Sequence, residues 1–215
     1  MTKCIFVTAT GTDIGKTYVS ALIVKNMREK GFNCGYYKPV LSGYTKEQND
    51  CKYVIEVAGL KEQDTDCLTY CFDEAVSPHL AAEHSGIRIS KEKILDDFKT
   101  KKQKYDYLLI EGAGGITCPL DLENNYLLNN LIKDMETEII VIADGGLGTI
   151  NSVLLTCEYA KNNGINVNGI ILNNYKDNFM YEDNKNVIEK LTGVKVIATV
   201  KCNDKNIDIT ESVFK

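Results

Sequence analysis

The chain has 215 residues, of which 44% are hydrophobic and 26% charged, proportions that are ordinary for one globular domain with a full core. Its formal net charge of −5 argues against nucleic acid as a partner, because nucleic-acid binders are more often basic. No apolar run is long enough to span a bilayer and no signal peptide precedes the first strand, so we expect a cytoplasmic protein with no membrane partner.

The first predicted strand covers 4–9 (CIFVTA), and an amphipathic helix is predicted over 16–30. Between them stands Gly15-Lys16-Thr17, in the strand, turn and helix context of a phosphate-binding loop. In such a loop Gly15 lets the backbone come close, Lys16 puts a positive charge on the β/γ-phosphates, and Thr17 offers a hydroxyl to Mg²⁺. The alternative is a plain turn with a surface lysine.

The loop departs from the usual spacing, G-x-x-x-x-G-K-[ST], because position 10 is Thr. Ala9 stands where a first glycine would be, so the loop is one residue longer and its φ at Ala9 must stay negative. Position 11 is Gly, where partition-type ATPases carry a second lysine. This difference disfavours a dimer-switch ATPase of that kind.

The next predicted strand, 34–39 (CGYYKP), carries Lys38 at its carboxyl end, and Ser42 follows. In open α/β sheets ligands bind outside the carboxyl ends of the strands, so Lys38 either meets a phosphoryl or carboxylate group there or lies in water. The stretch 44–88 is the least regular, and we expect helices and loops beside the functional edge. Within it, Asp50 is either a helix cap or, if the loop folds over the phosphate site, a metal ligand.

A buried strand over 105–112 (YDYLLIEG) ends at Glu111 and runs into a glycine-rich turn. An acid at the tip of a parallel strand, beside the strand of a phosphate loop, is well placed to coordinate Mg²⁺. The glycines let the chain pass close to a ligand. A purely structural turn is the less favoured interpretation.

The second half of the chain continues the alternation of helix and strand. Helices are predicted over 90–103 with Ser90 as cap, 124–135, 151–163 and 182–192, and strands over 138–144, 167–173 and 194–200. This rhythm predicts an α/β fold in three layers, with a mostly parallel sheet between helices. No linker-like stretch interrupts it, so we expect a single P-loop NTPase-like domain over residues 1–215.

The eight cysteines include no paired C-x-x-C, and the two histidines lie in a separate stretch, so no zinc-site spacing is present. In a reducing cytosol we expect free thiols, several of them buried.

Seven short motifs, taken in order, resemble the dethiobiotin synthetase family: ATGTDIGKT, YKPVLSG, ND at 49–50, SPHLAA, EGAGG, LGTIN and ILNN. Each motif is weak alone, but their order and spacing are specific. The resemblance implies a P-loop α/β ligase of biotin biosynthesis that uses ATP and Mg²⁺ and forms a homodimer. It also implies the substrates 7,8-diaminopelargonate and CO₂, and the products dethiobiotin, ADP and phosphate.

The resemblance implies a reaction in three steps. A substrate amine takes up CO₂ to form a carbamate, which attacks the γ-phosphate of ATP and gives a mixed carbamic–phosphoric anhydride. The second amine then closes the cyclic urea and expels phosphate. Clustered cations would stabilise the negative charge that gathers at the reacting centre.

The same resemblance implies residue roles. The catalytic residues would be Lys16 and Lys38, and the metal ligands Thr17, Asp50 and Glu111. The substrate-binding residues would be Thr12, Ser42 and, from a second subunit, Leu147, Gly148 and Asn151. The nucleotide-binding residues would be Asp13, Ile14, Gly15, Lys16, Thr17, Tyr18, Asp50, Glu111, Gly112, Ala113, Gly114, Asn173, Asn174, Lys201, Cys202 and Asn203.

Two departures from the family pattern bear on function. Asp13 stands where the family commonly has Glu, which keeps the charge on a shorter arm. Lys201 stands where the family usually has Pro in a segment against adenine, so the nucleotide base preference is open. Two alternatives also remain, a P-loop nucleotide-dependent switch and another P-loop synthetase that activates a different carboxylate. We expect Lys16→Ala and Lys38→Ala each to abolish turnover while the fold stays intact.

Overall fold

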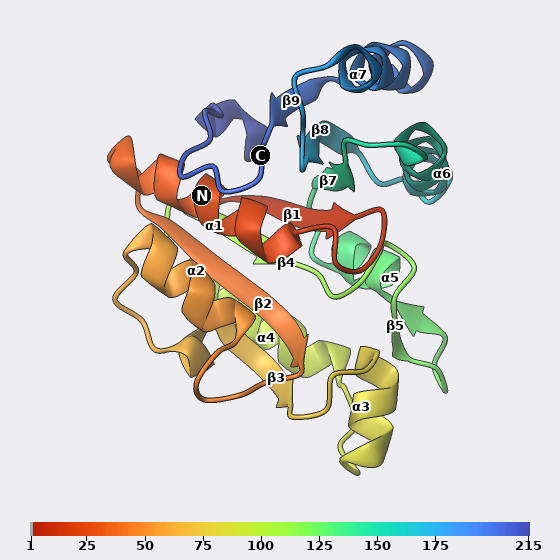
Figure 1. The fold of residues 1–215 in the computed structure, drawn as a ribbon. Helices are drawn as coiled ribbons and strands as arrows, with labels where there is room; N and C mark the ends of the chain where they lie inside the picture. The colour runs from red at the N-terminus through yellow and green to blue at the C-terminus, as the bar shows by residue number, and fades with distance from the viewer. Residues whose placement is uncertain (1) are drawn as a thin grey trace.

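The computed structural model describes residues 2–215 and is built around a seven-stranded sheet (Figure 1). The strands stand in the order β3-β2-β4-β1-β7-β8-β9, and all neighbours are parallel. Their bounds are β1 Lys3–Ala9, β2 Cys34–Ser42, β3 Leu68–Phe72, β4 Tyr107–Glu111, β7 Ile139–Asp144, β8 Val167–Asn173 and β9 Val196–Thr199. Two short antiparallel strands, β5 (Pro119–Asp121) and β6 (Tyr126–Leu127), stand outside this sheet.

Helices cover both faces of the sheet, as Figure 1 shows. Their bounds are α1 Lys16–Glu29, α2 Asp50–Ala58, α3 Pro78–His84, α4 Lys91–Lys102, α5 Leu128–Asp134, α6 Thr149–Asn162 and α7 Phe179–Thr192, with 3₁₀ turns at Asp64–Cys67 and Glu211–Val213. Because strand side chains alternate between faces, Ile5 and Val7 of β1 pack with α1 and α2, while Phe6 packs with the helices of the opposite face. Strands buried on both faces explain the near-continuous apolar runs of the sequence.

The structure confirms the predicted fold class and most of the elements. Strand β2 runs three residues past Pro39, because Lys38 and Val40 pair with β3 on either side of the proline. Strand β3 was not predicted. It is a short edge strand in which buried residues alternate with more exposed ones, so the apolar run that marks a central strand is missing.

Three helix starts differ from the predictions. The helix predicted over 124–135 begins only at Leu128, since Asn125 sits in a turn with φ 49° and β6 comes next. Helix α6 begins at Thr149, two residues before the predicted start. Helix α7 begins at Phe179, because Asn178 accepts hydrogen bonds from the backbone N–H groups of the first turn.

The C-terminal segment, residues 201–215, lies along α1 and returns to β1. Lys25 Nζ donates to the carbonyl of Lys205 at 2.8 Å, and Lys30 Nζ contacts Asp208 Oδ1 at 2.7 Å. At its end, the backbone N–H of Lys215 donates to the carbonyl of Cys4. The helix that follows the phosphate loop is therefore held between the sheet and this segment.

No helix among residues 2–215 combines the length and the apolar character needed to cross a bilayer. All eight cysteines lie within the described residues and all are free, as predicted, and five of them are buried.

Candidate functional site

The carboxyl ends of β1, β2 and β4 meet at one edge of the sheet, beside the start of α1. A cavity of about 1130 Å³ opens there. It is lined by predicted site residues from four separate stretches: Thr12, Asp13, Gly15, Lys16, Thr17, Tyr18, Lys38, Ser42, Asp50, Ala113 and Gly114. Glu111, fully buried, lies at the end of β4 beneath them. The structure thus brings most of the predicted phosphate and metal residues together.

The phosphate loop depends on glycine at position 15. Gly15 has φ 91°, in the left-handed region that favours glycine, and caps the start of α1. A Cβ there would lie 2.2 Å from the side-chain nitrogen of Asn173, so a larger residue would collide as well. Asp13, with φ 58°, takes the other left-handed position of the loop.

Lys16 begins α1 and folds back over the loop. Its Nζ donates to the carbonyl of Gly11 at 3.0 Å, and the residue is only 8% exposed. Burial lowers the pKa of Lys16 from its ordinary value, and the charge of Glu111 opposes that change. Lys16 is therefore a preplaced cation at the helix N-terminus, where anions bind most readily.

Lys38 lies between two carboxylates. Its Nζ is 2.6 Å from Asp50 Oδ2 and 2.7 Å from Glu111 Oε1. Burial alone would lower the pKa of Lys38, but the charges of Glu111 and Asp50 outweigh it and hold the pKa above its ordinary value. Lys38 is thus positively charged at neutral pH, and the alternative of a solvent-exposed lysine at the strand exit is wrong.

Three side chains donate to the Glu111 carboxylate. Thr17 Oγ1 and Lys38 Nζ contact Oε1 at 2.8 and 2.7 Å, while Tyr36 OH contacts Oε2 at 3.0 Å. Tyr36 was not among the predicted site residues. Its position two residues before Lys38 was the available signal, because residues i and i+2 of a strand face the same side.

The oxygen atoms of Thr17, Asp50 and Glu111 form a donor set that suits Mg²⁺. Mg²⁺ is usually bound by one or two carboxylates with phosphate oxygens and water, and the two carboxylates and one hydroxyl here match that pattern. Among residues 2–215 there is no cluster of three or more His, Cys, Asp and Glu side chains suited to a metal.

The glycine-rich turn after β4 lies close to the phosphate loop. A Cβ at Gly115 would lie 3.3 Å from the carbonyl of Ala9, and one at Gly114 would approach Cys118 at 3.2 Å. Gly112 is closed in by Leu128 and Phe6, so it holds the turn in place and does not line the cavity. Cys118 lines the cavity and was not predicted.

The predicted adenine residues lie outside the cavity. The side chain of Asn173 donates to the carbonyl of Ile14 at 2.8 Å, so it braces the phosphate loop, while its Oδ1 is buried without a hydrogen-bond partner. The Asn174 side chain donates to Asp144.

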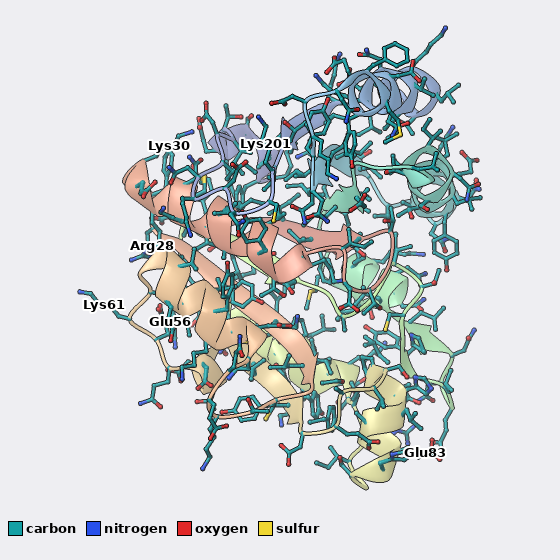
Figure 2. The ribbon with its side chains drawn as sticks, viewed as in Figure 1. Arg28, Lys30, Glu56, Lys61, Glu83 and Lys201 are labelled. Carbon is teal, nitrogen blue, oxygen red and sulfur yellow. The ribbon has the colours of Figure 1, made fainter. Side chains whose placement is uncertain are left out.

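The end of β9 leads into Lys201, Cys202 and Asn203, which begin the C-terminal segment. Lys201 Nζ pairs with Asp177, and its backbone N–H donates to Asp204. Figure 2 labels Lys201, the first residue of this segment, and Lys30 of the turn after α1, which pairs with Asp208 of the segment. Lys201, Cys202 and Asn203 follow β9, which is the last strand of the sheet on the side opposite to β2 and Lys38.

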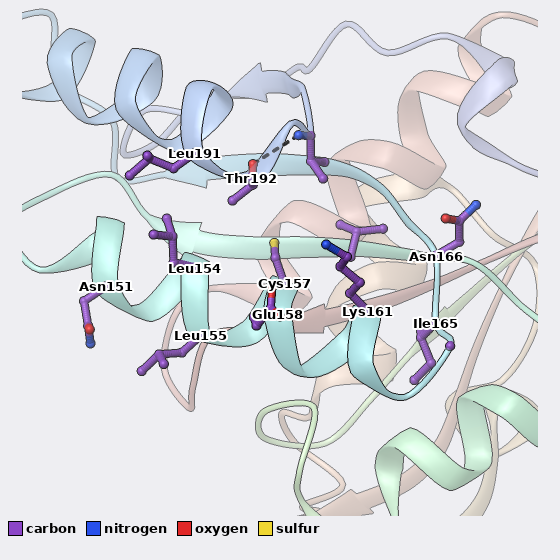
Figure 3. Close-up of a pocket in the computed structure, with 13 residues that line it drawn as sticks. Asn151, Leu154, Leu155, Cys157, Glu158, Lys161, Ile165, Asn166, Leu191 and Thr192 are labelled. Carbon is purple, nitrogen blue, oxygen red and sulfur yellow. Dashed lines mark hydrogen bonds between the residues drawn. The ribbon is translucent and has the colours of Figure 1, made fainter.

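The third predicted group, Leu147, Gly148 and Asn151, does not line the phosphate cavity. Gly148 caps α6 with φ 90°, and Leu147 is 91% exposed. Asn151 lines a different hollow, between α6 and α7 (Figure 3).

Comparison with known proteins gave three findings. A family model described as an AAA domain matches residues 3–209. The ATP-dependent dethiobiotin synthetase BioD of Clostridium perfringens (strain 13 / Type A) is 46% identical over 207 residues, covering 93% of this chain and 91% of that protein. The protein of the same name from Clostridium botulinum (strain Alaska E43 / Type E3) is 46% identical over 216 residues, covering 97% and 95%.

Among solved structures, the ParA family ATPase of Chlorobium tepidum TLS superposes with a TM-score of 0.59 at 14% sequence identity. The superposition covers 95% of this chain and 86% of that one. At this identity the likeness supports the fold alone.

Proposed function

Because the chain belongs to the ATP-dependent dethiobiotin synthetase family, we propose that it carboxylates 7,8-diaminopelargonate with CO₂ and closes the ring to dethiobiotin, with conversion of ATP to ADP and phosphate. The observation that carries this proposal is the convergence of Lys16 and Lys38 on one cavity beside the phosphate loop. The enzyme is a ligase that forms C–N bonds.

The proposed chemistry proceeds in three steps. A substrate amine attacks CO₂, loses a proton and becomes a carbamate. A carbamate oxygen then attacks the γ-phosphorus as the bond to ADP breaks, which gives a carbamic–phosphoric anhydride. The second amine attacks the carbonyl carbon, loses a proton, and phosphate departs with the electron pair of the C–O bond.

Negative charge accumulates in every one of these steps, and the two lysine cations would stabilise it. Lys16 would contact the β/γ-phosphates from the loop, while Lys38 would face the carbamate and the transferred phosphoryl group from β2. Both are held by the protein before substrate arrives, so little reorganisation is needed in the transition state. Thr12 and Ser42 line the same cavity and would orient the substrate.

Mg²⁺ fits the proposal through Thr17, Asp50 and Glu111, whose oxygen atoms suit it. When bound, the metal would neutralise phosphate charge during transfer. Ala113 and Gly114, which line the cavity, would pass along the nucleotide, and Gly112 would hold the turn behind them. Asn173 Oδ1, buried and without a partner, supports a base contact near Asn174 and residues 201–203.

A second copy of the chain would complete the substrate site. Leu147, Gly148 and Asn151 lie at the N-terminus of α6, which suits the substrate's carboxylate, but within one chain they do not line the phosphate cavity. Leu155 and Leu191, labelled in Figure 3, are exposed apolar residues at the hollow between α6 and α7. Together these features support a homodimer in which each site takes residues from both copies.

We further propose that residues 1–215 act as one domain in the cytoplasm. Two apolar clusters that share a single sheet support the single domain. The free thiols support the cytoplasmic location, because a reducing compartment keeps thiols from forming disulfides.

The test is phosphate release from Mg-ATP with bicarbonate, with and without 7,8-diaminopelargonate, together with detection of dethiobiotin. The proposal predicts release that depends on the diamine and matches the dethiobiotin formed. Release without the diamine would favour a nucleotide-dependent switch. If release instead depends on a different acid, the chain is another carboxylate-activating synthetase. The same assay with other nucleoside triphosphates would measure base preference.

A further inference from the structure

Tyr36 is a buried tyrosine whose hydroxyl lies against a charged group. It sits in the middle of β2 with 1% of its surface exposed, and its OH is 3.0 Å from Glu111 Oε2. Strand pairing explains the contact: Tyr36 pairs with Leu109 of β4, and Glu111 is two residues further on the same face.

The Glu111 carboxylate has two oxygens with separate neighbours. Oε1 accepts from Thr17 Oγ1 and Lys38 Nζ, whereas Oε2 accepts from Tyr36 OH. The terminal torsion of a glutamate is broad, so the side-chain rotamer alone does not fix the plane of the carboxylate. The tyrosine hydroxyl removes that freedom by holding Oε2 at the floor of the site.

The tyrosine hydroxyl is the donor in this contact, because an ionised carboxylate only accepts hydrogen bonds.

We propose that Tyr36 is a positioning residue of the proposed reaction, which holds Glu111 so that Oε1 faces Thr17, Lys38 and the metal-bound phosphates. The inference rests on the proposed function for the identity of the reaction. The property that it concerns is the dependence of nucleotide affinity on Mg²⁺, which we call the metal coupling. Without the hydroxyl, Glu111 would keep its charge and its place on β4 but would lose its fixed orientation.

The next residue of the strand supplies a matched control. Tyr37 is also fully buried, but it faces the other side of the sheet, where its OH contacts Thr69 Oγ1 and the carbonyl of Ile94. Tyr36→Phe and Tyr37→Phe therefore remove the same atom from the same strand, and only the first change touches Glu111.

The experiment measures binding and needs no turnover. The affinity of a non-hydrolysable ATP analogue is determined by calorimetry in Mg²⁺ and in chelator for each folded protein. The ratio of the two dissociation constants gives the metal coupling. We expect this ratio to fall about tenfold in Tyr36→Phe, because a hydrogen bond to a charged group is lost, and to stay unchanged in Tyr37→Phe. The affinity in chelator should change little in both variants.

A double variant guards against a purely structural effect. If Tyr36 acts through Glu111, then Tyr36→Phe combined with Glu111→Gln lowers the coupling no further than Glu111→Gln alone. The inference fails if Tyr36→Phe keeps the wild-type ratio, if it weakens binding equally with and without metal, or if the wild-type protein has no metal coupling. Wild-type coupling without any dethiobiotin formed would instead overturn the proposed function and leave the role of Tyr36 standing.

Discussion

Lys16 and Lys38 reach the same cavity, but their surroundings differ. Lys16 is bound to a backbone carbonyl, so its removal leaves no charge behind. Lys38 neutralises the buried Glu111 and the half-exposed Asp50, so its removal leaves a buried carboxylate without a cation. Equal losses of activity would therefore come with unequal losses of stability.

For Lys16→Ala we expect turnover to fall by about a thousandfold while the thermal midpoint changes little, because the charge acts on the transferred phosphate. The measurements are steady-state kinetics and thermal unfolding of the same preparation. Near-wild-type turnover would remove Lys16 from the mechanism.

For Lys38→Ala the structure revises the expectation of an intact fold. We expect loss of turnover together with a loss of about 3–5 kcal/mol in the free energy of unfolding, because Glu111 stays buried without its partner. Urea denaturation measures this change. Adding Glu111→Gln should restore part of the stability and none of the activity, and a stable single variant would contradict the account.

At the scale of single residues, the sequence predicted the residues that line the site better than the residues that hold them in place by hydrogen bonds. Gly15, Lys16 and Thr17 follow from a local pattern, because strand, turn and helix are contiguous in the chain. Tyr36 and the bracing role of Asn173 depend on contacts between distant segments, and no local pattern contains that information.

Helix α2 is the element that places Asp50 beside Lys38. Its cap, Asn49, accepts from the backbone N–H of Lys52 and also donates to Thr45 and Asp64. A short helix of this kind depends strongly on its cap and its packing. The position of Asp50, the proposed metal ligand, is thus tied to the cap residue that precedes it.

We expect Asn49→Ala to lower the free energy of unfolding by about 1–2 kcal/mol and also to weaken Mg²⁺-dependent nucleotide binding, since Asp50 loses its support. Ser90→Ala is the matched control, because Ser90 caps α4 by accepting from Lys93 N–H and lies away from the cavity. It should cost similar stability and leave binding unchanged. Equal binding losses in both variants would refute the link.

At the scale of elements, predictions succeeded for the buried strands and for α4. Helix α4 begins at Lys91 with Ser90 as cap, as the sequence predicts, and β8 has the predicted bounds. The start of α5 and the strand β3 were missed, because a tight turn at Asn125 and a sheet-edge pairing both depend on neighbouring segments.

The buried thiols make the free energy of unfolding of the whole molecule fall as the pH becomes alkaline. Burial raises the pKa of Cys34 and of Cys67 to about 12, and that of Cys4 to about 11. In the unfolded chain a thiol titrates near pH 8.5, at about its ordinary value. Because the folded pKa is the higher one, the stability that each buried thiol contributes is complete below about pH 8.5. It is lost as the pH rises towards the folded pKa.

We therefore expect the free energy of unfolding, measured in urea with a reductant, to fall steadily between about pH 8.5 and 10.5. Cys34→Ala should make that slope shallower, whereas Cys202→Ala, at an exposed thiol, serves as the control. A flat profile over this range would contradict the burial of the thiols.

For the molecule as a whole, the sequence predicted the class of fold and the strands that carry the phosphate loop and Glu111. It did not predict the order of the strands, because alternation along the chain is compatible with several orders. The likeness to a ParA family ATPase at a TM-score of 0.59 agrees with the predicted class.

The position of β4 has a consequence for folding kinetics. This strand lies between β1 and β2, and its Leu108 pairs with Cys4, more than a hundred residues earlier in the chain. Pairings between such distant segments form slowly, because a large loop must close before any contact stabilises it. Since Glu111 is on β4, refolding molecules should acquire metal-dependent nucleotide binding in the slowest phase, well after helical circular dichroism has returned.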